Sequence, residues 1–365
     1  MELKVDSELK KFNALCFLEG GSLLLAKGNE LFIFNIKTQT KSHLVSLPYP
    51  IHKKILSKFR LVFRLLRMGV RYAIPIDKNV ILAAFDNVFY EININSGSFK
   101  KTFNILRGNR PLNISEVKDI VGFDPTFYFG EYFMNFEKAP VHIYKRLVTG
   151  EWSIAHTFPA GSIEHVHAIV PDKYRNCVWV FTGDFDDAAA IWMAKDNFNE
   201  VIPILIGDQK YRACVGFPEE KGLVYATDSQ FEINSVRLLT EINDKWESKF
   251  IFEVNGPVIY GCKVKDKLFF STSVEGDSVA KGTILKYLDR QLGPGIKENY
   301  SHIVSGNLKE GFEVVNRNQK DIYPFLLFQF GVLTFPMGEN LSNQLYAYNV
   351  SLVNNDLGTT VFNIN

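Results

Sequence analysis

A unit of two apolar runs, joined by a polar turn and ended by a carboxylate, occurs four times in this 365-residue chain. The copies begin at Arg71, His165, Tyr211 and Val258 and read RYAIPIDKNVILAAFD, HVHAIVPDKYRNCVWVFTGD, YRACVGFPEEKGLVYATD and VIYGCKVKDKLFFSTSVE. A spacing of about 45 residues, or twice that, is typical of radial blade architectures, in which each repeat folds as one small antiparallel sheet. The repeat predicts an all-β chain folded as a β-propeller.

The spacing predicts seven blades of four strands, with six blades as the alternative. The predicted blades span residues 13–47, 70–105, 115–158, 162–205, 210–253, 256–300 and 310–362. The N-terminal residues are expected to supply the outer strand of the last blade, because that pairing removes free sheet edges. Repetition along most of the length favours a single domain over residues 1–365.

One segment, residues 53–68, has helical period and is predicted to be an insertion between the first two blades. Its apolar side is formed by Ile55, Phe59, Val62, Phe63 and Leu66. Its other side carries Arg60, Arg64 and Arg67, continued by Arg71. No Asp or Glu occurs between Leu31 and Ile76, so this surface is locally basic. Two interpretations are open: a helix packed on the propeller with a solvated basic face, or peripheral contact of Arg60, Arg64 and Arg67 with an anionic sugar chain, phosphate or membrane surface.

Composition narrows the class and the compartment. The chain is 46% hydrophobic and 22% charged, with a net charge of +1, so it can bury a large core and has no overall attraction to nucleic acid. The N-terminal MELKVDSELKK lacks the apolar core of a signal peptide, and no stretch is apolar enough to span a membrane. The cysteines are scattered and lack metal-site spacing: Cys16, Cys177, Cys214 and Cys262. These features predict a cytoplasmic protein.

The repeat also indicates where a site should lie. In a four-stranded blade, the end of the second strand and the start of the first lie at the same rim, so both sets of end residues should meet at one mouth of the central channel. The carboxylates that end second strands are Asp86, Glu131, Asp184, Asp228 and Glu275. The polar residues that enter first strands include Arg71, His165, His167, Gln209, Tyr211 and Arg212. The alternative is that each acid only accepts hydrogen bonds from backbone in a turn.

His165 and His167 are the sharpest local signal, since a spacing of two on a strand sends both imidazoles to one side. Asp184 and Asp186 repeat that spacing at the neighbouring strand end. Polar channel lining, acid–base or substrate contact, and binding of a divalent metal are all open roles. A metal would require a third ligand that the spacing does not reveal, so no metal or other cofactor is assigned.

We therefore take two sets of candidate site residues from the sequence. The candidate catalytic residues are His165, His167, Asp184 and Glu131. The candidate substrate contacts are Arg71, Arg110, Gln209, Tyr211, Arg212, Asp228 and Glu275. Arg110 belongs to a loop, LRGNRPLN, that also offers Arg107 and Asn109 to an anionic group.

Two short segments, TGEWS around Gly150–Trp152 and AKDNF around Asp196–Phe198, resemble degenerate Asp-box (BNR) turns of sialidase-type propellers. The run GSIEHVHAIVPDKYRNCVWVFTGD, followed by QKYRACVG and LVYATD, is also similar to uncharacterised bacterial sialidase-like propeller proteins associated with surface-polysaccharide genes. The resemblance implies a link to glycans. It assigns no catalytic residue, because the sialidase arginine triad and tyrosine nucleophile have no counterparts that can be placed here.

Two functions follow as hypotheses. The first is a cytoplasmic glycan-processing enzyme, a hydrolase or lyase, that acts on an acidic sugar at the channel mouth. The alternative is a non-catalytic propeller that binds a glycan, a nucleotide-sugar or a protein partner as a scaffold. A phosphate-binding glycine loop, a GxSxG elbow and an HExxH motif are all absent from the sequence.

Overall fold

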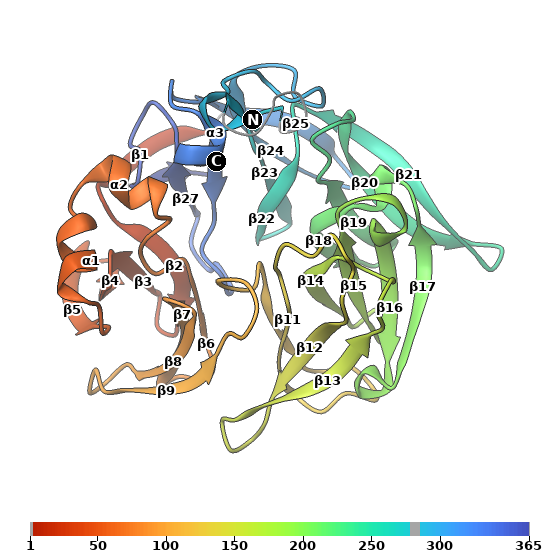
Figure 1. The fold of residues 1–365 in the computed structure, drawn as a ribbon, viewed down its shortest axis with the longest axis horizontal. Helices are drawn as coiled ribbons and strands as arrows, with labels where there is room; N and C mark the ends of the chain where they lie inside the picture. The colour runs from red at the N-terminus through yellow and green to blue at the C-terminus, as the bar shows by residue number, and fades with distance from the viewer. Residues whose placement is uncertain (1–2, 278–284, 365) are drawn as a thin grey trace. The chain divides into compact units, whose positions relative to one another are not determined.

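A computed structural model describes residues 3–277 and 285–364, and this part of the chain contains seven four-stranded antiparallel sheets (Figure 1). In six of them the four strands follow one another in chain order. Seven four-stranded sheets make the fold a seven-bladed β-propeller, as the repeat predicts. The internal contacts divide the chain into two units: Met1–Lys101 with Asn255–Asn365, and Thr102–Val254.

The unit Thr102–Val254 holds three blades. The first is β10 (Ile114–Val117), β11 (Thr126–Gly130), β12 (Val141–Arg146) and β13 (Trp152–Phe158). The second is β14 (His165–Asp172), β15 (Cys177–Gly183), β16 (Ala190–Lys195) and β17 (Glu200–Ile206). The third is β18 (Ala213–Glu219), β19 (Gly222–Thr227), β20 (Asn234–Ile242) and β21 (Lys245–Val254). Three 3-10 turns precede or join these strands: η1 (Asp186–Ala188), η2 (Asp196–Phe198) and η3 (Gln209–Tyr211).

The other unit holds the remaining four blades. The first is β2 (Asn13–Leu18), β3 (Ser22–Lys27), β4 (Glu30–Asn35) and β5 (Thr40–Ser46). The second is β6 (Tyr72–Pro75), β7 (Val80–Phe85), β8 (Val88–Asn93) and β9 (Phe99–Asn104), and the residues of β9 from Thr102 on are counted in the other unit. The third is β22 (Val258–Val264), β23 (Lys267–Thr272), β24 (Tyr300–Asn307) and β25 (Gly311–Gln319). The fourth is β26 (Val332–Thr334), β27 (Gln344–Val350), β28 (Thr359–Asn363) and β1 (Lys4–Leu9). The predicted contribution of the N-terminus is confirmed, since β1 pairs with β28.

The repeat can be detected in the sequence because the second strand of a blade is buried on both faces. Every residue of β15 and of β19 is buried, so these strands are almost continuous apolar runs, as expected for strands covered on both sides. The outer strands alternate between exposed and part-buried residues, as in β13 and β21, and leave a weaker pattern.

A bulge recurs in the first strand of four blades. One extra residue stands on the first strand between Ala14 and Cys16, Val166 and Ala168, Ala213 and Val215, and Val258 and Tyr260. The extra residues in the unit Thr102–Val254 are His167 and Cys214, which therefore hold equivalent positions on consecutive blades. Bulges re-aim side chains at strand ends.

The predicted bounds of the last two blades were wrong. The blade predicted at 256–300 keeps its first two strands, but its third and fourth strands, β24 and β25, lie at 300–319, after a long connection from Thr272. The apolar run FLLF, inside the predicted last blade, is not a strand but the short helix α3 (Phe325–Phe328). Apolar runs this short do not distinguish a buried strand from a buried helical turn.

The basic insertion is helical, as predicted, but it forms two short helices, α1 (Ile51–Leu56) and α2 (Arg60–Leu65). The predicted solvated position of Arg64 is wrong, because its side chain is completely buried. Arg64 donates to Asp321, to Asp356 Oδ2 at 3.2 Å and to the Phe328 carbonyl oxygen at 3.0 Å. The break at 57–59 interrupts the 3.6-residue period on which the predicted face depended. No helix among the described residues is long and apolar enough to cross a membrane.

Candidate functional site

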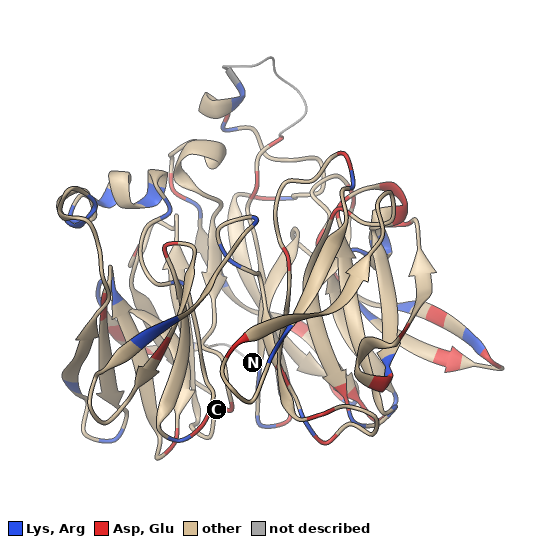
Figure 2. Ribbon diagram, turned by 60° about the horizontal axis from the view of Figure 1, so that its bottom comes forward, with Lys and Arg blue, Asp and Glu red and all other residues tan. Residues whose placement is uncertain are grey.

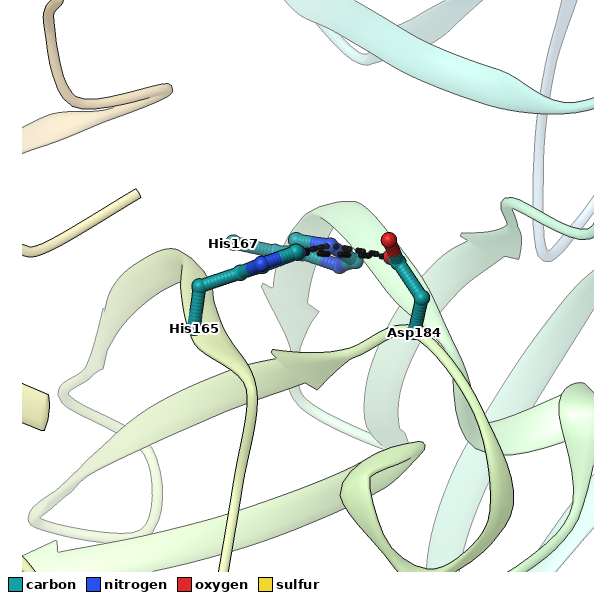
Figure 3. Close-up of side chains that lie close together, drawn as sticks. All are labelled: His165, His167 and Asp184. Atoms are coloured by element: carbon teal, nitrogen blue, oxygen red, sulfur yellow. Dashed lines mark hydrogen bonds and ion pairs between the residues drawn. The ribbon is translucent and has the colours of Figure 1, made fainter. Parts of the chain in front are cut away.

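Three polar side chains of one blade meet at the start of β14 and the end of β15. The Nε2 atoms of His165 and His167 are 3.0 Å apart. Asp184 Oδ1 lies 3.1 Å from His167 Nε2 and 3.3 Å from His165 Nε2. Figure 3 shows the two rings and the carboxylate pointing at one another. The structure thus brings together three of the residues that the sequence indicated, in a triangle of nearly equal edges.

The far nitrogen of each ring is fixed by a backbone carbonyl. His165 Nδ1 lies 3.1 Å from Phe133 O, and His167 Nδ1 lies 3.0 Å from Ala213 O. A carbonyl oxygen only accepts, so each Nδ1 carries the hydrogen and each neutral ring presents a lone pair at Nε2. Two nitrogen lone pairs and one carboxylate oxygen therefore converge on the same small space.

The bulge and a glycine make this convergence possible. His167 is the extra residue of β14, so its ring does not follow the simple alternation of the strand. Gly183, opposite His165 on β15, faces the ring of His167: a Cβ placed there would lie 2.2 Å from His167 Cε1 and 2.6 Å from Nε2. Only glycine leaves room for the imidazole in this position.

We expect Gly183→Ala to displace the His167 ring while the strands stay paired. If His167 binds a divalent ion, this displacement should weaken the binding, since loss of a residue that orients a metal ligand typically costs about 10–100-fold in affinity. Titration of the purified variant with Mn²⁺ and Zn²⁺, followed by calorimetry, measures this directly. Unchanged affinity for both ions would show that the position of the His167 ring does not matter for binding.

Asp184 is held from three sides. Arg212 Nη2 forms an ion pair with Asp184 Oδ1 at 3.1 Å. Gln209 Nε2 donates to the Asp184 carbonyl oxygen at 2.8 Å, and the Asp184 N–H donates to Glu164 Oε2 at 3.1 Å. Burial opposes ionisation of this carboxyl, but the neighbouring Arg212 guanidinium is the chief effect that holds the pKa of Asp184 well below its ordinary value. Asp184 is thus an ionised carboxylate on a fixed backbone.

A second buried group adjoins the first. Arg212 NH2 lies 3.5 Å from Asp228 Oδ2, and the Cys214 thiol donates to the same oxygen at 3.2 Å. Burial raises the pKa of Asp228 and, with Asp228, raises that of Cys214 well above its ordinary value. His167, Cys214 and Asp228 each offer a potential ligand atom within 4.8 Å of one another. Arg212 therefore lies between two aspartates.

Three residues of this site escaped the sequence analysis. Tyr132 packs edge-on against the His165 ring, with ring centroids 4.6 Å apart. Burial, and to a smaller extent the nearby Asp184 carboxylate, raises the pKa of the Tyr132 phenol. Cys214 was interpreted only as a small apolar residue. Its place at a bulge equivalent to that of His167 was the signal that could have identified it. Glu164 gives no such signal, because nothing in its spacing shows that it accepts from the N–H of Asp184.

Other candidate residues have different roles. The Glu131 carboxylate, predicted to be catalytic, accepts from Arg107 Nε at 2.9 Å and from the backbone N–H of His142 at 2.8 Å, so it is committed to a buried ion pair. Asp186, expected beside Asp184, is exposed in η1. Tyr211 is part-buried under Lys210, whose Nζ lies 5.2 Å from the ring centroid.

The remaining candidates differ in unit or in environment. Arg110 is part-exposed in its loop. Asp86 belongs to the other unit, where it sits in the turn after β7 with positive φ and accepts from Lys53 Nζ at 2.7 Å. Arg71 and Glu275 belong to that unit too, and Glu275 accepts from the Ser273 hydroxyl at 2.5 Å. Asp86 thus forms an ion pair with the Lys53 side chain, not with a backbone donor of the turn, while Asp184 and Asp228 belong to the cluster.

Comparisons with known proteins identify the fold and no family. Neither a protein-family model nor a curated protein matches the chain. Similar solved structures include an oligogalacturonate lyase in complex with manganese, at 10% identity and a TM-score of 0.58, covering 100% of this chain and 97% of that one. An oligogalacturonate lyase from Vibrio parahaemolyticus is 11% identical, with a TM-score of 0.57 and coverage of 100% and 96%. A chain of the mitotic checkpoint complex is 8% identical, with a TM-score of 0.57 and coverage of 99% and 94%.

These likenesses place the chain among β-propeller proteins. Their low identities establish the architecture alone, since propellers carry unrelated functions. No family model supports the resemblance to sialidase-type propellers.

Proposed function

We propose that the chain is a metal-dependent enzyme that processes an acidic glycan, with His165, His167 and Asp184 as the metal ligands. The observation that carries the proposal is the triangle of His165 Nε2, His167 Nε2 and Asp184 Oδ1, together with the Nδ1 hydrogen bonds that leave both Nε2 lone pairs free to bind. Metal-binding histidines commonly donate their other N–H to a backbone carbonyl in this way.

The edge lengths fit a first-row divalent ion. With metal–ligand bonds of about 2.1 Å, neighbouring ligand atoms are about 3.0 Å apart in octahedral geometry and about 3.4 Å apart in tetrahedral geometry. The observed edges of 3.0, 3.1 and 3.3 Å lie within that interval. The three ligand atoms all carry lone pairs that repel one another. A proton shared between two of them relieves the repulsion along that edge of the triangle, whereas a metal cation bound by all three relieves it along every edge. Two imidazoles and a carboxylate on one face leave the remaining coordination positions for substrate.

A divalent ion in this site would favour an anionic substrate. With Asp184, Asp228 and Glu164 ionised and Arg212 positive, the ion would bring the sum of charges to zero, so the ion itself would attract the anionic group of a substrate. Such a centre would polarise a carboxylate or hydroxyl oxygen of a bound sugar. Two of the structural neighbours are lyases named for an acidic oligosaccharide, and one is a manganese complex, which agrees with this choice of substrate class.

A non-catalytic propeller that binds a glycan, nucleotide-sugar or protein is the second candidate. Burial of the imidazoles favours it, because His165 is only 5% and His167 only 2% exposed, and Asp184 offers the accessible edge of the cluster. A site with so little access is suited to holding an ion that organises a binding surface.

Turnover of defined oligosaccharides separates the two candidates. Protein stripped with a chelator and then supplied with Mn²⁺, Zn²⁺ or Fe²⁺ is incubated with uronic-acid oligosaccharides and with neutral malto-oligosaccharides, and new reducing ends and unsaturated products are measured. Cleavage of acidic substrates that requires the added ion supports the enzyme. Metal-dependent binding without cleavage supports the second candidate. Cleavage that is indifferent to chelation, or no effect of any ion on the protein, refutes the proposal.

A further inference from the structure

The insertion that carries α1 and α2 exposes apolar side chains that a soluble helix pair would normally bury. Six large apolar residues within 51–66 are at least one-third exposed: Ile51 (80%), Ile55 (53%), Leu56 (36%), Phe59 (59%), Leu65 (42%) and Leu66 (52%). We call these six residues the apolar patch. Single exposed apolar side chains are ordinary, but a cluster this dense marks a surface that contacts something else.

The patch is interleaved with basic residues. Lys54 and Lys58 are exposed between its members, and Arg60 is 49% exposed at the start of α2. No acidic residue occurs from residue 32 to residue 75, and in Figure 2 both helices are drawn in tan and blue without red. Exposed apolar groups and cations therefore share one short segment.

This combination points to a lipid surface. The core of a protein–protein interface is depleted in lysine, because burying an ammonium group is unfavourable. At a membrane interface, lysine stems lie along the apolar region while their charged ends reach the lipid headgroups. Helices that lie in the interface plane have this pattern of apolar residues with lysine and arginine.

The patch is presented by a fixed platform. Buried Arg64 ties α2 to segments far along the chain, with its NH2 donating to Ser351 Oγ at 2.7 Å and Gln329 Nε2 donating to the Arg64 carbonyl oxygen at 2.8 Å. These partners belong to the same unit as the helices. The exposure of the patch is thus a property of the packed fold.

We propose that the apolar patch and its lysines dock the protein on the surface of an anionic membrane. Phe59, Ile55 and Ile51 would enter the headgroup region, and Lys54 and Lys58 would meet lipid phosphates and carboxylates. Arg64 takes no part in the contact, because the fold already uses its guanidinium. The proposal is independent of the metal site.

Vesicle co-sedimentation tests this surface with the full chain. We expect binding to phosphatidylcholine vesicles containing 30 mol% phosphatidylserine to be at least about tenfold stronger than to pure phosphatidylcholine vesicles, and to weaken as salt rises. Ile55→Ser with Phe59→Ser should reduce the binding about tenfold or more, and so should Lys54→Gln with Lys58→Gln.

Matched controls come from exposed residues of the other unit. Ile233→Ser with Phe250→Ser removes side chains that are 66% and 59% exposed, and Lys245→Gln with Lys249→Gln removes two exposed charges. Both controls should bind as wild type does. The proposal would be overturned if the protein bound neutral and anionic vesicles equally, or if the patch variants bound as wild type does. A concentration-dependent dimer that only the patch variants lose would also overturn it, because the partner would then be a second copy of the chain.

Discussion

Replacing both histidines, His165→Gln with His167→Gln, is expected to remove the bound divalent ion and to lower turnover of an acidic oligosaccharide by at least about 10³-fold. The variant loses two of the three ligand atoms, and a lone carboxylate already paired with Arg212 cannot hold the ion. Elemental analysis of the purified proteins should give about one equivalent of metal in the wild type and less than about a tenth in the variant.

The fold should survive this change. The two imidazoles are buried, so they do not line a solvated channel, and each makes one hydrogen bond to a backbone carbonyl. Glutamine is close to histidine in volume and keeps a polar amide at each position, so we expect a stability loss below about 2 kcal/mol.

The control is His142→Gln in the same unit, where the ring contacts Thr157 near the surface. It should retain the metal and the activity. A double variant that keeps its ion would exclude these ligands. If the wild type contains no metal but is active, and the double variant has lost that activity, the histidines act as an acid–base pair.

Arg64→Met is expected to lower the free energy of unfolding by about 3–5 kcal/mol, the range for breaking a buried ion pair from one side. The change removes the buried partner of Asp321 and of Asp356, whose side chains are only 10% and 3% exposed, and leaves them with Lys320 and Arg60 respectively. It also leaves the Phe328 carbonyl oxygen without the guanidinium donors. Urea unfolding at pH 7 measures the loss.

Arg60→Gln is the matched control, since Arg60 NH1 contacts the same Asp356 oxygen at 3.1 Å from an exposed position. We expect a loss below about 1 kcal/mol, as for other exposed pairs. Part of the lost stability should be recovered when the two carboxylates are neutralised by adding Asp321→Asn and Asp356→Asn to Arg64→Met. A loss of less than about 1 kcal/mol for Arg64→Met alone would contradict the view that this network anchors α2.

The blade plan could be predicted because its strongest signal is local. Each first and second strand forms a hairpin with continuous apolar runs, as in β14–β15 and β18–β19. The bounds of the last two blades could not be predicted. The first strand of the last blade, β26, has only three residues, and residues 273–299 interrupt the period of the preceding blade. Arg64 was misplaced for a different reason: its partners lie more than 250 residues away, and no local pattern reveals them.

The sequence indicated His165, His167, Asp184 and Arg212, but neither their geometry nor the neighbouring Tyr132, Cys214 and Glu164. Strand direction brings His165, Asp184 and Arg212 together, and the spacing of two adds His167. The bulge that turns His167, the carbonyls that fix both rings and the space beside Gly183 depend on tertiary contacts. Those contacts turn a generic polar lining into a set of aligned lone pairs.

The pairing of β1 with β28 also constrains how the chain is made. Residues 4–9 leave the ribosome long before their partners, residues 359–363. Until those partners have been made, β1 is an exposed strand with an open edge, available for mispairing with other nascent chains. A ribosome that stalls before Thr359 would release a chain whose last sheet lacks β28, so completion of this sheet requires synthesis beyond that strand.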